Sequence, residues 1–375
     1  MHNAPQICFT FVGEVTRDSR LRRFVELAAT MAPTAILALS ADGGPGHFAG
    51  AHTHIIPMKD KSLRTALPLF WRIDTQTDAF SSCRLWFAAD LYSLPLAARA
   101  ARRSGGVLLY DARELYSSIA ALDDRKWTQR FWKLIEQRYA KKAKALFTVN
   151  ASIADIYRER YEHVHVVRNV PDAVVTERTY TIEQHLGLKG DAFILLSQGG
   201  LQHGRGALLY VEALSQLPDC TLVFLGDGPM KGEIELAAEM HGVANRVHFL
   251  PAVPSAELLQ WTASADIGLC MIENLGRSYY LSLPNKLFEY FAAGLPVIGS
   301  AFPEIGSVLK ETGAGIAIDP GSMDDFVAAV RRIRDEEDLR VQLTARSRVA
   351  GERYQWEKES EVLHGVLQET AGRKQ

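Results

Sequence analysis

The chain of 375 residues is longer than a single hydrophobic core usually serves, so its length predicts two compact domains. Its content of 47% hydrophobic and 23% charged residues is typical of a globular enzyme and excludes a disordered or fibrous chain. Because 42 basic residues nearly balance 44 acidic ones, the net charge of -2 argues against a protein that binds nucleic acid.

The spacing of the cysteines and the length of the apolar runs indicate the cellular compartment. The four cysteines lie far apart and form no Cys-x-x-Cys pair, which favours a reducing, cytoplasmic setting over a disulfide framework or a zinc site. The N-terminus lacks the order of a signal peptide, and no apolar run reaches the roughly 18 residues of a membrane-spanning helix. We therefore expect any membrane contact to be peripheral, on the inner face of the membrane.

Short runs rich in β-branched and aromatic residues alternate with stretches of helical period, a pattern typical of parallel sheets with crossover helices. The strands expected in the first half are Gln6–Val12, Thr34–Leu39, His54–Pro57, Leu85–Ala88, Val107–Tyr110, Leu146–Val149 and Val164–Val167. Those expected in the second half are Phe193–Gln198, Thr221–Leu225, Val247–Leu250, Ile267–Met271, Pro296–Gly299 and Gly315–Ile318. Each half therefore predicts its own doubly wound parallel sheet.

Pro171 marks the expected domain boundary, because it pushes Val170 toward extended geometry and interrupts the periodicity. We expect an N-terminal domain at residues 1–170 and a C-terminal domain at residues 171–354. A C-terminal helix at residues 355–375 is expected to pack back on the N-terminal domain. The last three helices are expected at Met323–Arg334, Leu339–Tyr354 and Trp356–Glu369.

Loops at the carboxyl ends of parallel strands are the candidate sites, because such sheets bind their ligands there. The strand Phe193–Gln198 is followed by a loop that ends where a helix starts near Ala207; it contains Gly199, Gly200, Gly204, Arg205 and Gly206. Glycines let the backbone approach a ligand, the helix N-terminus offers free N–H groups, and the arginine adds a permanent charge. The loop predicts a diphosphate site, with a glycine-rich turn and a solvated arginine as the alternative.

Lys286 and Glu289 are three residues apart near the start of a helix that Gly294 closes. This spacing places both side chains on one helix face, where the cation could meet phosphate and the carboxylate could accept ribose hydroxyl groups. Taken alone, however, the pair favours a surface ion pair worth about a few tenths of a kcal/mol. The segment Leu225–Pro229, which contains Gly228, predicts a tight structural turn after a strand.

Together these segments resemble the C-terminal domain of family 4 glycosyltransferases, the retaining group of the fold B class. The specific part of the resemblance covers residues of about 190–330 and comprises Gly199–Gly206, Leu225–Pro229, Val247–Leu250, Ala265–Leu269, Asn285–Tyr290, Ala293–Ile298 and Gly313–Gly315. The first half is similar more weakly, through Asp18–Arg20, Asp90–Pro95, Tyr110–Leu115 and Thr148–Asn150. The resemblance implies an α/β protein of the GT-B fold, with two Rossmann-like, doubly wound domains that face a cleft.

The resemblance also implies transfer of a sugar from a nucleotide-sugar donor, with retention of the anomeric configuration. Arg205 stands where the family has its phosphate-binding lysine, Glu289 stands where its glutamate contacts the nucleotide ribose, and Lys286 is the expected second phosphate ligand. In the first half, Asp111 and Arg113 are the expected catalytic residues. Contacts to substrate are expected at Gly13, Gly199, Gly200, His203, Gly204, Gly228 and Asn285.

Three positions depart from the pattern of the family. The family often has a second glutamate eight residues before Glu289, where this chain has Leu281. A histidine is expected where Arg113 stands, and an arginine where Gly200 stands. Because these departures concern the donor sugar and the acceptor, the identity of both stays open.

Neither a metal ion nor a cofactor is expected, because no Asp-x-Asp triplet occurs that would bridge a metal to the diphosphate. Fixed cations and helix N–H groups can instead neutralise the leaving diphosphate. No carboxylate stands out as a nucleophile, so we expect a front-face route in which the departing phosphate helps to deprotonate the acceptor. Asp111 and Glu114 are expected on the cleft side of a loop in the N-terminal domain. The alternative for both carboxylates is capping of a helix near residues 113–121.

Residues 95–145 are strongly basic, with 12 Lys and Arg against 5 Asp and Glu. Part of this segment fits an amphipathic helix that contains Trp127, Phe131, Leu134 and Ile135 together with Arg125, Lys126, Arg130, Lys133, Arg138, Lys141 and Lys142. Such a helix could rest on anionic lipid and deliver a lipid-linked acceptor. A helix packed on the sheet, with a solvated basic rim, is the alternative.

The leading hypothesis is a glycosyltransferase of polysaccharide, glycolipid or glycoconjugate synthesis. A sugar-nucleotide epimerase on the same fold is a second hypothesis, which the departures at Leu281 and Arg113 do not favour. A third is a catalytically silent subunit that retains the fold and binds a partner glycosyltransferase. The same departures are its best support.

Overall fold

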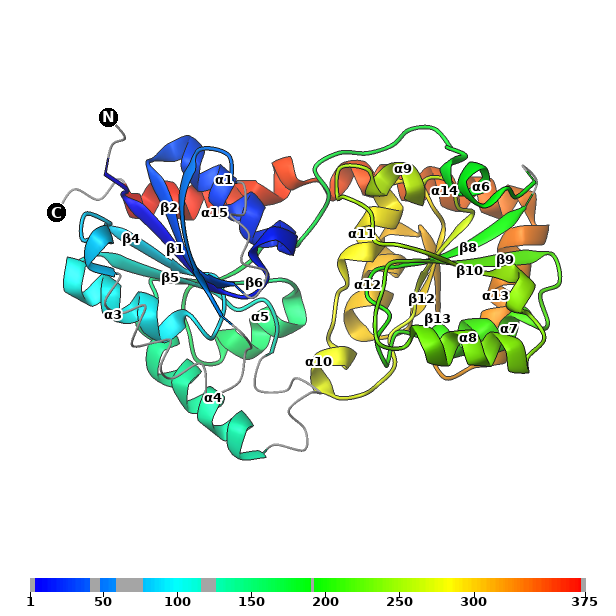
Figure 1. Ribbon diagram of the computed structural model, residues 1–375, viewed down its shortest axis with the longest axis horizontal. Helices are drawn as coiled ribbons and strands as arrows, with labels where there is room; N and C mark the ends of the chain where they lie inside the picture. The colour runs from blue at the N-terminus through cyan, green and yellow to red at the C-terminus, as the bar shows by residue number, and fades with distance from the viewer. Residues whose placement is uncertain (1–3, 41–47, 59–76, 116–125, 190–191, 372–375) are drawn as a thin grey trace. The chain divides into compact units, whose positions relative to one another are not determined.

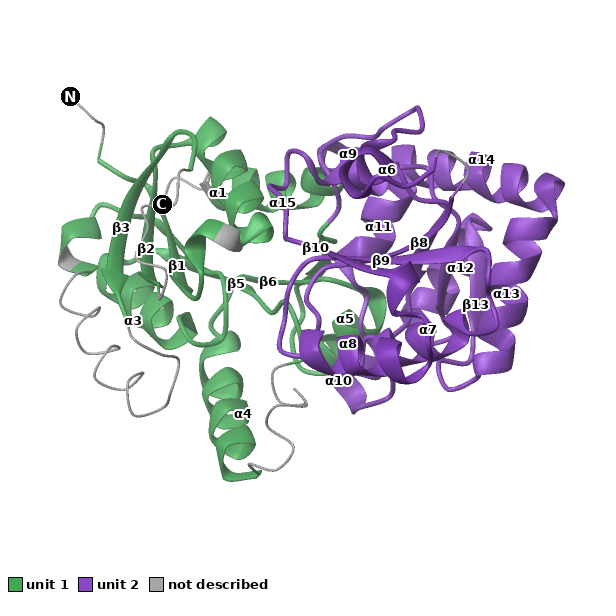
Figure 2. Cartoon of the chain, turned by 45° about the vertical axis from the view of Figure 1, so that its right-hand side comes forward, with its two compact units in different colours: residues 1–169, 359–375 green, residues 170–358 purple. Residues whose placement is uncertain are grey.

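The computed structural model describes residues 4–40, 48–58, 77–115, 126–189 and 192–371. The chain divides into unit 1, residues 1–169 and 359–375, and unit 2, residues 170–358 (Figure 2). The last helix, α15 (Trp356–Ala371), therefore begins in unit 2 and continues in unit 1. The boundary expected from the sequence lies one residue later, at 171, and the whole of residues 355–375 was expected to be a separate helix.

Unit 1 is built on a parallel sheet of seven strands in the order β3-β2-β1-β4-β5-β6-β7 (Figure 1). Its strands are β1 (Ile7–Val12), β2 (Thr34–Ser40), β3 (Ala51–Pro57), β4 (Leu85–Ala88), β5 (Val107–Asp111), β6 (Ala145–Thr148) and β7 (Val164–Val166). Its other helices of more than one turn are α1 (Ser19–Met31), α3 (Leu94–Ser104), α4 (Lys126–Ala140) and α5 (Ala151–Arg158). Every residue of β1 and β2 is buried, as expected of strands that helices cover on both faces.

Unit 2 is built on a parallel sheet of six strands in the order β10-β9-β8-β11-β12-β13. Its strands are β8 (Phe193–Gln198), β9 (Cys220–Leu225), β10 (Val247–Leu250), β11 (Ile267–Cys270), β12 (Val297–Ser300) and β13 (Gly315–Ile318). Its helices are α6 (Thr181–Leu186), α7 (Ala207–Leu214), α8 (Lys231–Met240), α9 (Leu258–Thr262), α10 (Arg277–Tyr280), α11 (Asn285–Ala292), α12 (Pro303–Thr312), α13 (Met323–Asp335) and α14 (Glu337–Arg353).

The sheet of unit 2 separates two hydrophobic cores. Because side chains alternate along a strand, Leu195 of β8 joins the core with α7, α8 and α13, whereas Ile194 and Leu196 join the core with α11 and α12. The prediction of two doubly wound parallel sheets is confirmed. Each expected strand corresponds to one of β1 to β13, with bounds that differ by three residues at most.

Candidate functional site

The order of strands in unit 2 reverses direction between β8 and β11, and ligands of doubly wound sheets bind at such a switch point. The first two residues of β11, Ile267 and Gly268, pair with the middle of β8 at Leu195 and Leu196. Beyond that pair, the hydroxyl group of Tyr290 bridges the strands, 3.1 Å from the Gln198 amide nitrogen and 3.2 Å from the Leu269 carbonyl oxygen. The carboxyl ends of β8 and β11 are thus held apart, with their backbone groups satisfied.

The ring of Tyr290 can occupy this position because residue 268 is glycine. A Cβ atom on Gly268 would lie 2.3 Å from Cγ of Tyr290, well inside van der Waals contact. Tyr290 is fully buried and adjoins Glu289 on α11. The close packing therefore fixes the register of α11 against the switch point.

The glycine loop between β8 and α7 adopts backbone angles that favour glycine. Gly199, Gly204 and Gly206 have positive φ values of 104°, 78° and 75°. A Cβ atom on Gly204 would lie 2.6 Å from Leu275, because the segment after β11 packs directly over the loop. The space next to Gly200 is open, since a Cβ atom there would have no neighbour nearer than 3.6 Å.

A second glycine turn supports the loop. The Leu201 amide donates to the Asp227 carbonyl oxygen at 3.0 Å, and a Cβ atom on Gly228 would lie 2.3 Å from the carbonyl oxygen of Leu201. The close approach of the two backbones accounts for glycine at position 228. The geometry gives Gly228 this packing role, and a contact with substrate stays a prediction.

Lys286 is the buried cation of the site. Its side chain is 8% exposed, and its Nζ atom lies 3.4 Å from the carbonyl oxygen of Leu269 at the end of β11. Burial, together with the nearby charge of Arg205, lowers the pKa of Lys286 from 10.5 to about 8, whereas Cys270 and Glu289 oppose this shift. The three residues predicted from the sequence are thus near enough to influence one another electrostatically.

Arg205 presents a guanidinium group to the same region. Its Cζ atom lies 5.7 Å from the ring centroid of Tyr279, a cation–π arrangement. Within the described residues, its buried Nε atom has no hydrogen-bond partner. A buried donor without a partner is costly, so this group is suited to an acceptor that a ligand would supply.

Glu289 is held in place by two polar side chains from the switch point. The Gln198 side-chain amide donates to the Glu289 carboxylate at 2.5 Å, and the Thr262 hydroxyl donates to the Gln198 side-chain oxygen at 2.8 Å. Gln198 and Thr262 are buried, whereas Glu289 is partly exposed. The Glu289 carboxylate is therefore held in one orientation and is accessible to a ligand.

Three residues of this site were not predicted from the sequence: Gln198, Glu273 and Tyr279. The Glu273 carboxylate accepts from the Gly206 amide at 3.2 Å, at the N-terminus of α7, and its own backbone amide donates to the Gly204 carbonyl oxygen. Tyr279 donates to the His203 carbonyl oxygen at 3.3 Å and packs beside Arg205. The available signal was the position of Gln198 at the end of β8 and of Glu273 in the loop that follows β11.

Two other predicted positions, His203 and Asn285, are exposed, whereas the departure at Leu281 is buried. The His203 side chain is 67% exposed, with its Nε2 atom 3.8 Å from the Glu233 carboxylate. Asn285 is exposed at the first residue of α11. Leu281 is buried at the end of α10, so an apolar contact replaces the carboxylate that the family pattern would place there.

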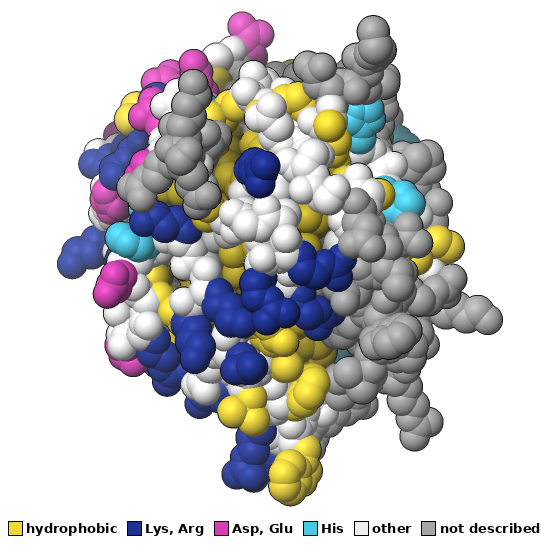
Figure 3. Space-filling view, turned by 90° about the vertical axis from the view of Figure 1, so that its left-hand side faces the viewer, with side chains coloured by type: hydrophobic (Ala, Val, Ile, Leu, Met, Phe, Trp, Pro, Cys, Tyr) yellow, Lys and Arg dark blue, Asp and Glu magenta, His cyan; other side chains and the backbone are white. Residues whose placement is uncertain are grey.

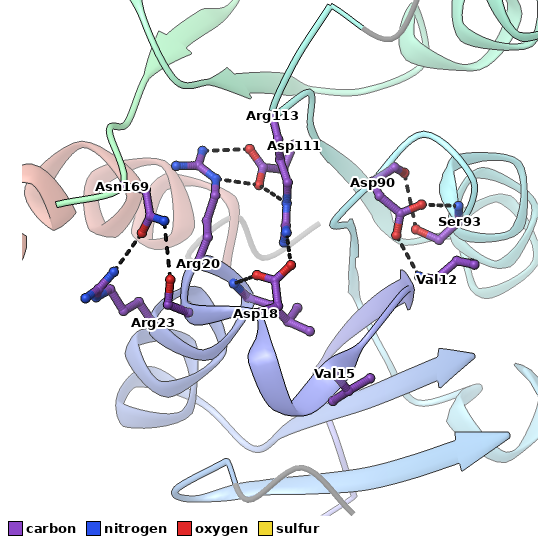
Figure 4. A network of polar contacts seen from close by, with 12 residues as sticks. Val12, Val15, Asp18, Arg20, Arg23, Asp90, Ser93, Asp111, Arg113 and Asn169 are labelled. Atoms are coloured by element: carbon purple, nitrogen blue, oxygen red, sulfur yellow. Dashed lines mark hydrogen bonds and ion pairs between the residues drawn. The ribbon is translucent and has the colours of Figure 1, made fainter. Parts of the chain in front are cut away.

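Unit 1 has its own switch point, between β1 and β4, and polar residues gather at the carboxyl ends of its strands (Figure 4). Arg20 of α1 binds the Asp111 carboxylate with two hydrogen bonds of 2.8 and 2.7 Å, and both side chains are buried. Arg113 donates to Asp111 at 3.1 Å and also to Asp18. Asp111 therefore holds two guanidinium groups, and Arg113, at 16% exposed, is the one that reaches the surface.

Asp90 lies at the switch point of unit 1. Its carboxylate accepts from the amides of Val12 and Ser93 at 2.7 and 2.8 Å, which ties the end of β1 to the start of α3. Burial raises the pKa of Asp90 to about 6, although these hydrogen bonds and the charge of Arg113 oppose the shift. A Cβ atom on Gly13 would lie 2.5 Å from the ring of Phe11, which would have to move, and a contact of Gly13 with substrate stays a prediction.

The structure bears on two further expectations. Among the described residues, no group of three or more His, Cys, Asp and Glu side chains is arranged to hold a metal ion. In the same part of the chain, no helix is both long and apolar enough to cross a bilayer. Metal independence and the compartment stay predictions, and the alternative capping role near residues 113–121 falls largely outside the described residues.

The burial of Lys286 predicts a gain in stability on its removal. The folded state holds a proton on a lysine whose pKa is about 8 rather than 10.5, so folding is penalised below pH 8 and the penalty fades as the pH rises toward 10.5. We expect Lys286→Met to raise the free energy of unfolding at pH 7 by about 1 to 3 kcal/mol. Urea denaturation at pH 7 and pH 10 measures this change.

The exposed residue Lys310 of α12 provides the matched control, because Lys310→Met removes the same charge without relieving burial. Its effect should be small and should not depend on pH. A Lys286→Met variant that is less stable than the natural chain at pH 7 would show that the buried cation is neutralised within the protein.

Comparison with known proteins identifies the C-terminal part of the chain. Residues 179–349 match the family model described as glycosyl transferases group 1. A D-inositol 3-phosphate glycosyltransferase of Thermomonospora curvata is 31% identical over 176 residues, which cover 43% of this chain and 39% of that protein. The chain thus spans less than half the length of this curated relative.

Solved structures match nearly the whole chain at low sequence identity. The sucrose-phosphate synthase of Thermosynechococcus elongatus has a TM-score of 0.79 at 15% identity, over 97% of this chain and 99% of that one. HepE of Anabaena, solved in complex with UDP and glucose, has a TM-score of 0.74 at 15% identity, over 96% and 99%. Residues 179–349 are therefore similar to the glycosyl transferases group 1 family, and the chain has the GT-B fold.

Proposed function

We propose that this chain is a glycosyltransferase that takes a sugar from a nucleoside-diphosphate donor bound in unit 2. The observation that carries the proposal is a set of three charged groups at the β8/β11 switch point. Lys286 is a buried cation, Arg205 has a buried donor without a partner among the described residues, and Glu289 is oriented by Gln198. Two cations and one accessible carboxylate are suited to a diphosphate and a ribose.

In this proposal the two cations act on the leaving group. When the sugar departs, negative charge grows on the diphosphate, and fixed charges stabilise it without having to reorganise. Lys286 is held by packing within α11, and Arg205 lies in a loop that Glu273 and Tyr279 fasten. Glu289, which is partly exposed on α11, is then available to accept hydrogen bonds from the ribose hydroxyl groups.

The comparisons support a nucleotide-sugar donor without identifying it. One structural neighbour was solved with UDP-glucose, and several relatives have the word glycosyltransferase in their names. We infer that the sugar keeps its anomeric configuration and that no metal ion is needed, because the resemblance implies retention and the chain has no Asp-x-Asp triplet. Unit 1 is the proposed acceptor domain, with Arg113 as its accessible charged group.

The central test is Glu289→Ala. We expect this variant to bind UDP about 10 to 100 times more weakly, because hydrogen bonds to a charged group contribute about 1.5 to 3 kcal/mol. Calorimetric titration of UDP measures the change, and Glu239→Ala is a matched control because Glu239 is exposed on α8 of the same unit.

Equal UDP affinity of the two variants would contradict the assignment of Glu289. Incubation with a panel of nucleotide sugars, with and without chelator, separates the competing functions. Slow release of the nucleotide supports a transferase, isomerisation of the donor supports an epimerase, and no stabilisation by any nucleotide supports a silent subunit.

We also propose that α4 of unit 1 binds the surface of a membrane peripherally. In this proposal the protein acts in the cytoplasm, in polysaccharide or glycolipid synthesis. One face of this helix is buried through Trp132, Glu136 and Ala140. Among the described residues, the opposite side exposes large apolar groups: Trp127 at 82%, Leu134 at 65% and Phe131 at 37%. Arg125, which was expected from the sequence to belong to this helix, lies outside the described residues.

Basic side chains flank this apolar surface. Exposed residues at or near α4 include Lys126, Arg130, Lys133, Arg138, Lys141 and Lys142. Figure 3 shows apolar and basic side chains side by side on the lower part of one face of the molecule, where α4 lies in Figure 1. Apolar groups that enter the headgroup region and cations that meet anionic lipid are the two components of peripheral binding.

Liposome flotation tests this surface. The natural chain should float with vesicles that contain phosphatidylglycerol and less with pure phosphatidylcholine, and the double variant Trp127→Ser/Leu134→Ser should lose most of this binding. The matched control is Leu236→Ser/Met240→Ser, which removes comparably exposed apolar groups from α8 of unit 2. Equal flotation of both double variants, or binding that high salt leaves unchanged, would contradict a role for α4.

A further inference from the structure

A pocket of about 610 Å³ opens within unit 2, away from the groups described above. Its walls come from residues that precede strands β8, β11 and β12 and from one face of helix α14. The volume lies in the range of pockets that hold small metabolites. We call it the arginine pocket, because Arg178, Arg340 and Arg348 line it.

The arginine pocket lies at the edge of the sheet opposite to the proposed donor site. It is lined by Phe193, the first residue of β8, whereas the donor site begins at Gln198, the last residue of that strand. A strand rises by about 3.3 Å per residue, so the two sites are about 16 Å apart along β8. A ligand in the pocket would therefore not touch Lys286 or Glu289.

The pocket has more positive than negative charge, with three arginines against one aspartate among its lining residues. Asp266 is the one acidic residue among its lining residues, and both of its oxygens are engaged, by Arg178 at 2.6 Å and by the Ile194 amide at 2.7 Å. Within the described residues, neither Arg340 nor Arg348 has a carboxylate partner. Two guanidinium groups therefore remain to attract an anion.

These two arginines are arranged along one ridge of α14. Arg340, Thr344 and Arg348 follow one another at intervals of four residues, so their side chains lie on the same side of the helix. The Arg340 guanidinium is oriented by the carbonyl oxygen of Arg334 at 2.6 Å. The stem of Arg348 lies against Gly294, where φ is 72° and a Cβ atom would be 3.1 Å from Cγ of the arginine.

The floor of the pocket is apolar and preformed. The floor is formed by the small side chains of Ala263, Ala265 and Ala293 together with Leu295. The Ser347 hydroxyl donates to the Leu295 carbonyl oxygen at 2.6 Å, which fastens α14 to the loop before β12. The backbones also meet at Gly351, where a Cβ atom would lie 2.5 Å from the Phe291 carbonyl oxygen.

We propose that the arginine pocket binds a small phosphorylated metabolite, with its phosphate between Arg340 and Arg348 and its body on the apolar floor. Guanidinium groups match the geometry of phosphate oxygens, and two of them balance the charge of a phosphate dianion. The Thr344 side chain, between them on the ridge, adds a hydroxyl donor. This site is separate from the donor site, and its occupancy does not depend on the proposed transferase activity.

Phenyl phosphate is a suitable probe, because it joins a phosphate to an apolar body. The titration uses the full chain with Arg205→Gln and Lys286→Met, which removes the cations of the donor site, so that binding there cannot be mistaken for binding in the pocket. We expect this background variant to bind phenyl phosphate more tightly than inorganic phosphate. Adding Arg348→Gln should weaken phenyl phosphate binding at least tenfold.

The matched control adds Arg346→Gln instead, since Arg346 is an exposed arginine of the same helix outside the pocket. This change should alter the affinity by less than twofold. A second pocket variant, Ala345→Trp, narrows the pocket without removing a charge and should also weaken binding. Equal affinity of the Arg348→Gln and Arg346→Gln variants, or no binding by the background variant, would overturn the proposal.

Discussion

A buried, protonated lysine is the constraint on which the switch point of unit 2 depends. Lys286 is shielded from water at the end of β11, next to a second cation, and these surroundings lower its pKa to about 8. Such a charge destabilises a folded protein unless a partner neutralises it. Glu289 reduces this cost in part. In the proposed function a bound anion offsets the remaining charge, at the switch point where ligands of doubly wound sheets bind.

The charged side chains at the two switch points are paired differently. In unit 1, Arg20 is matched by Asp111 in a bidentate pair, and Arg113 is matched by Asp111 and Asp18, so each guanidinium group has a carboxylate partner within the unit. In unit 2, Arg205 and Lys286 have no carboxylate in such a pair among the described contacts. The first arrangement pairs the charges within the unit, whereas the second leaves two cations for the ligand of the proposed function. Tyr290 maintains that second arrangement, because its hydroxyl holds β8 and β11 apart.

The fold was largely predictable from the sequence, because buried parallel strands are short apolar runs and the crossover helices have their own period. Lys286 and Glu289 could also be paired, since their spacing on one helix is a local property. Gln198 could not be connected to Glu289 in this way, because 91 positions separate them and only the folded sheet brings them together. The pairing of Arg20 with Asp111 is equally non-local. Likewise, the requirement for glycine at position 228 depends on the backbone of another loop.

Binding of a nucleoside diphosphate by protonated Lys286 is the central claim, and proton uptake tests it most directly. At pH 8.5 a lysine with a pKa of about 8 is mostly neutral, so binding of UDP must draw a proton from the buffer. Calorimetric titration of UDP in two buffers of different ionisation enthalpy counts that proton. We expect an uptake of about 0.7 proton per UDP in the natural chain at pH 8.5 and none in Lys286→Arg. UDP binding without proton uptake in the natural chain would contradict the claim.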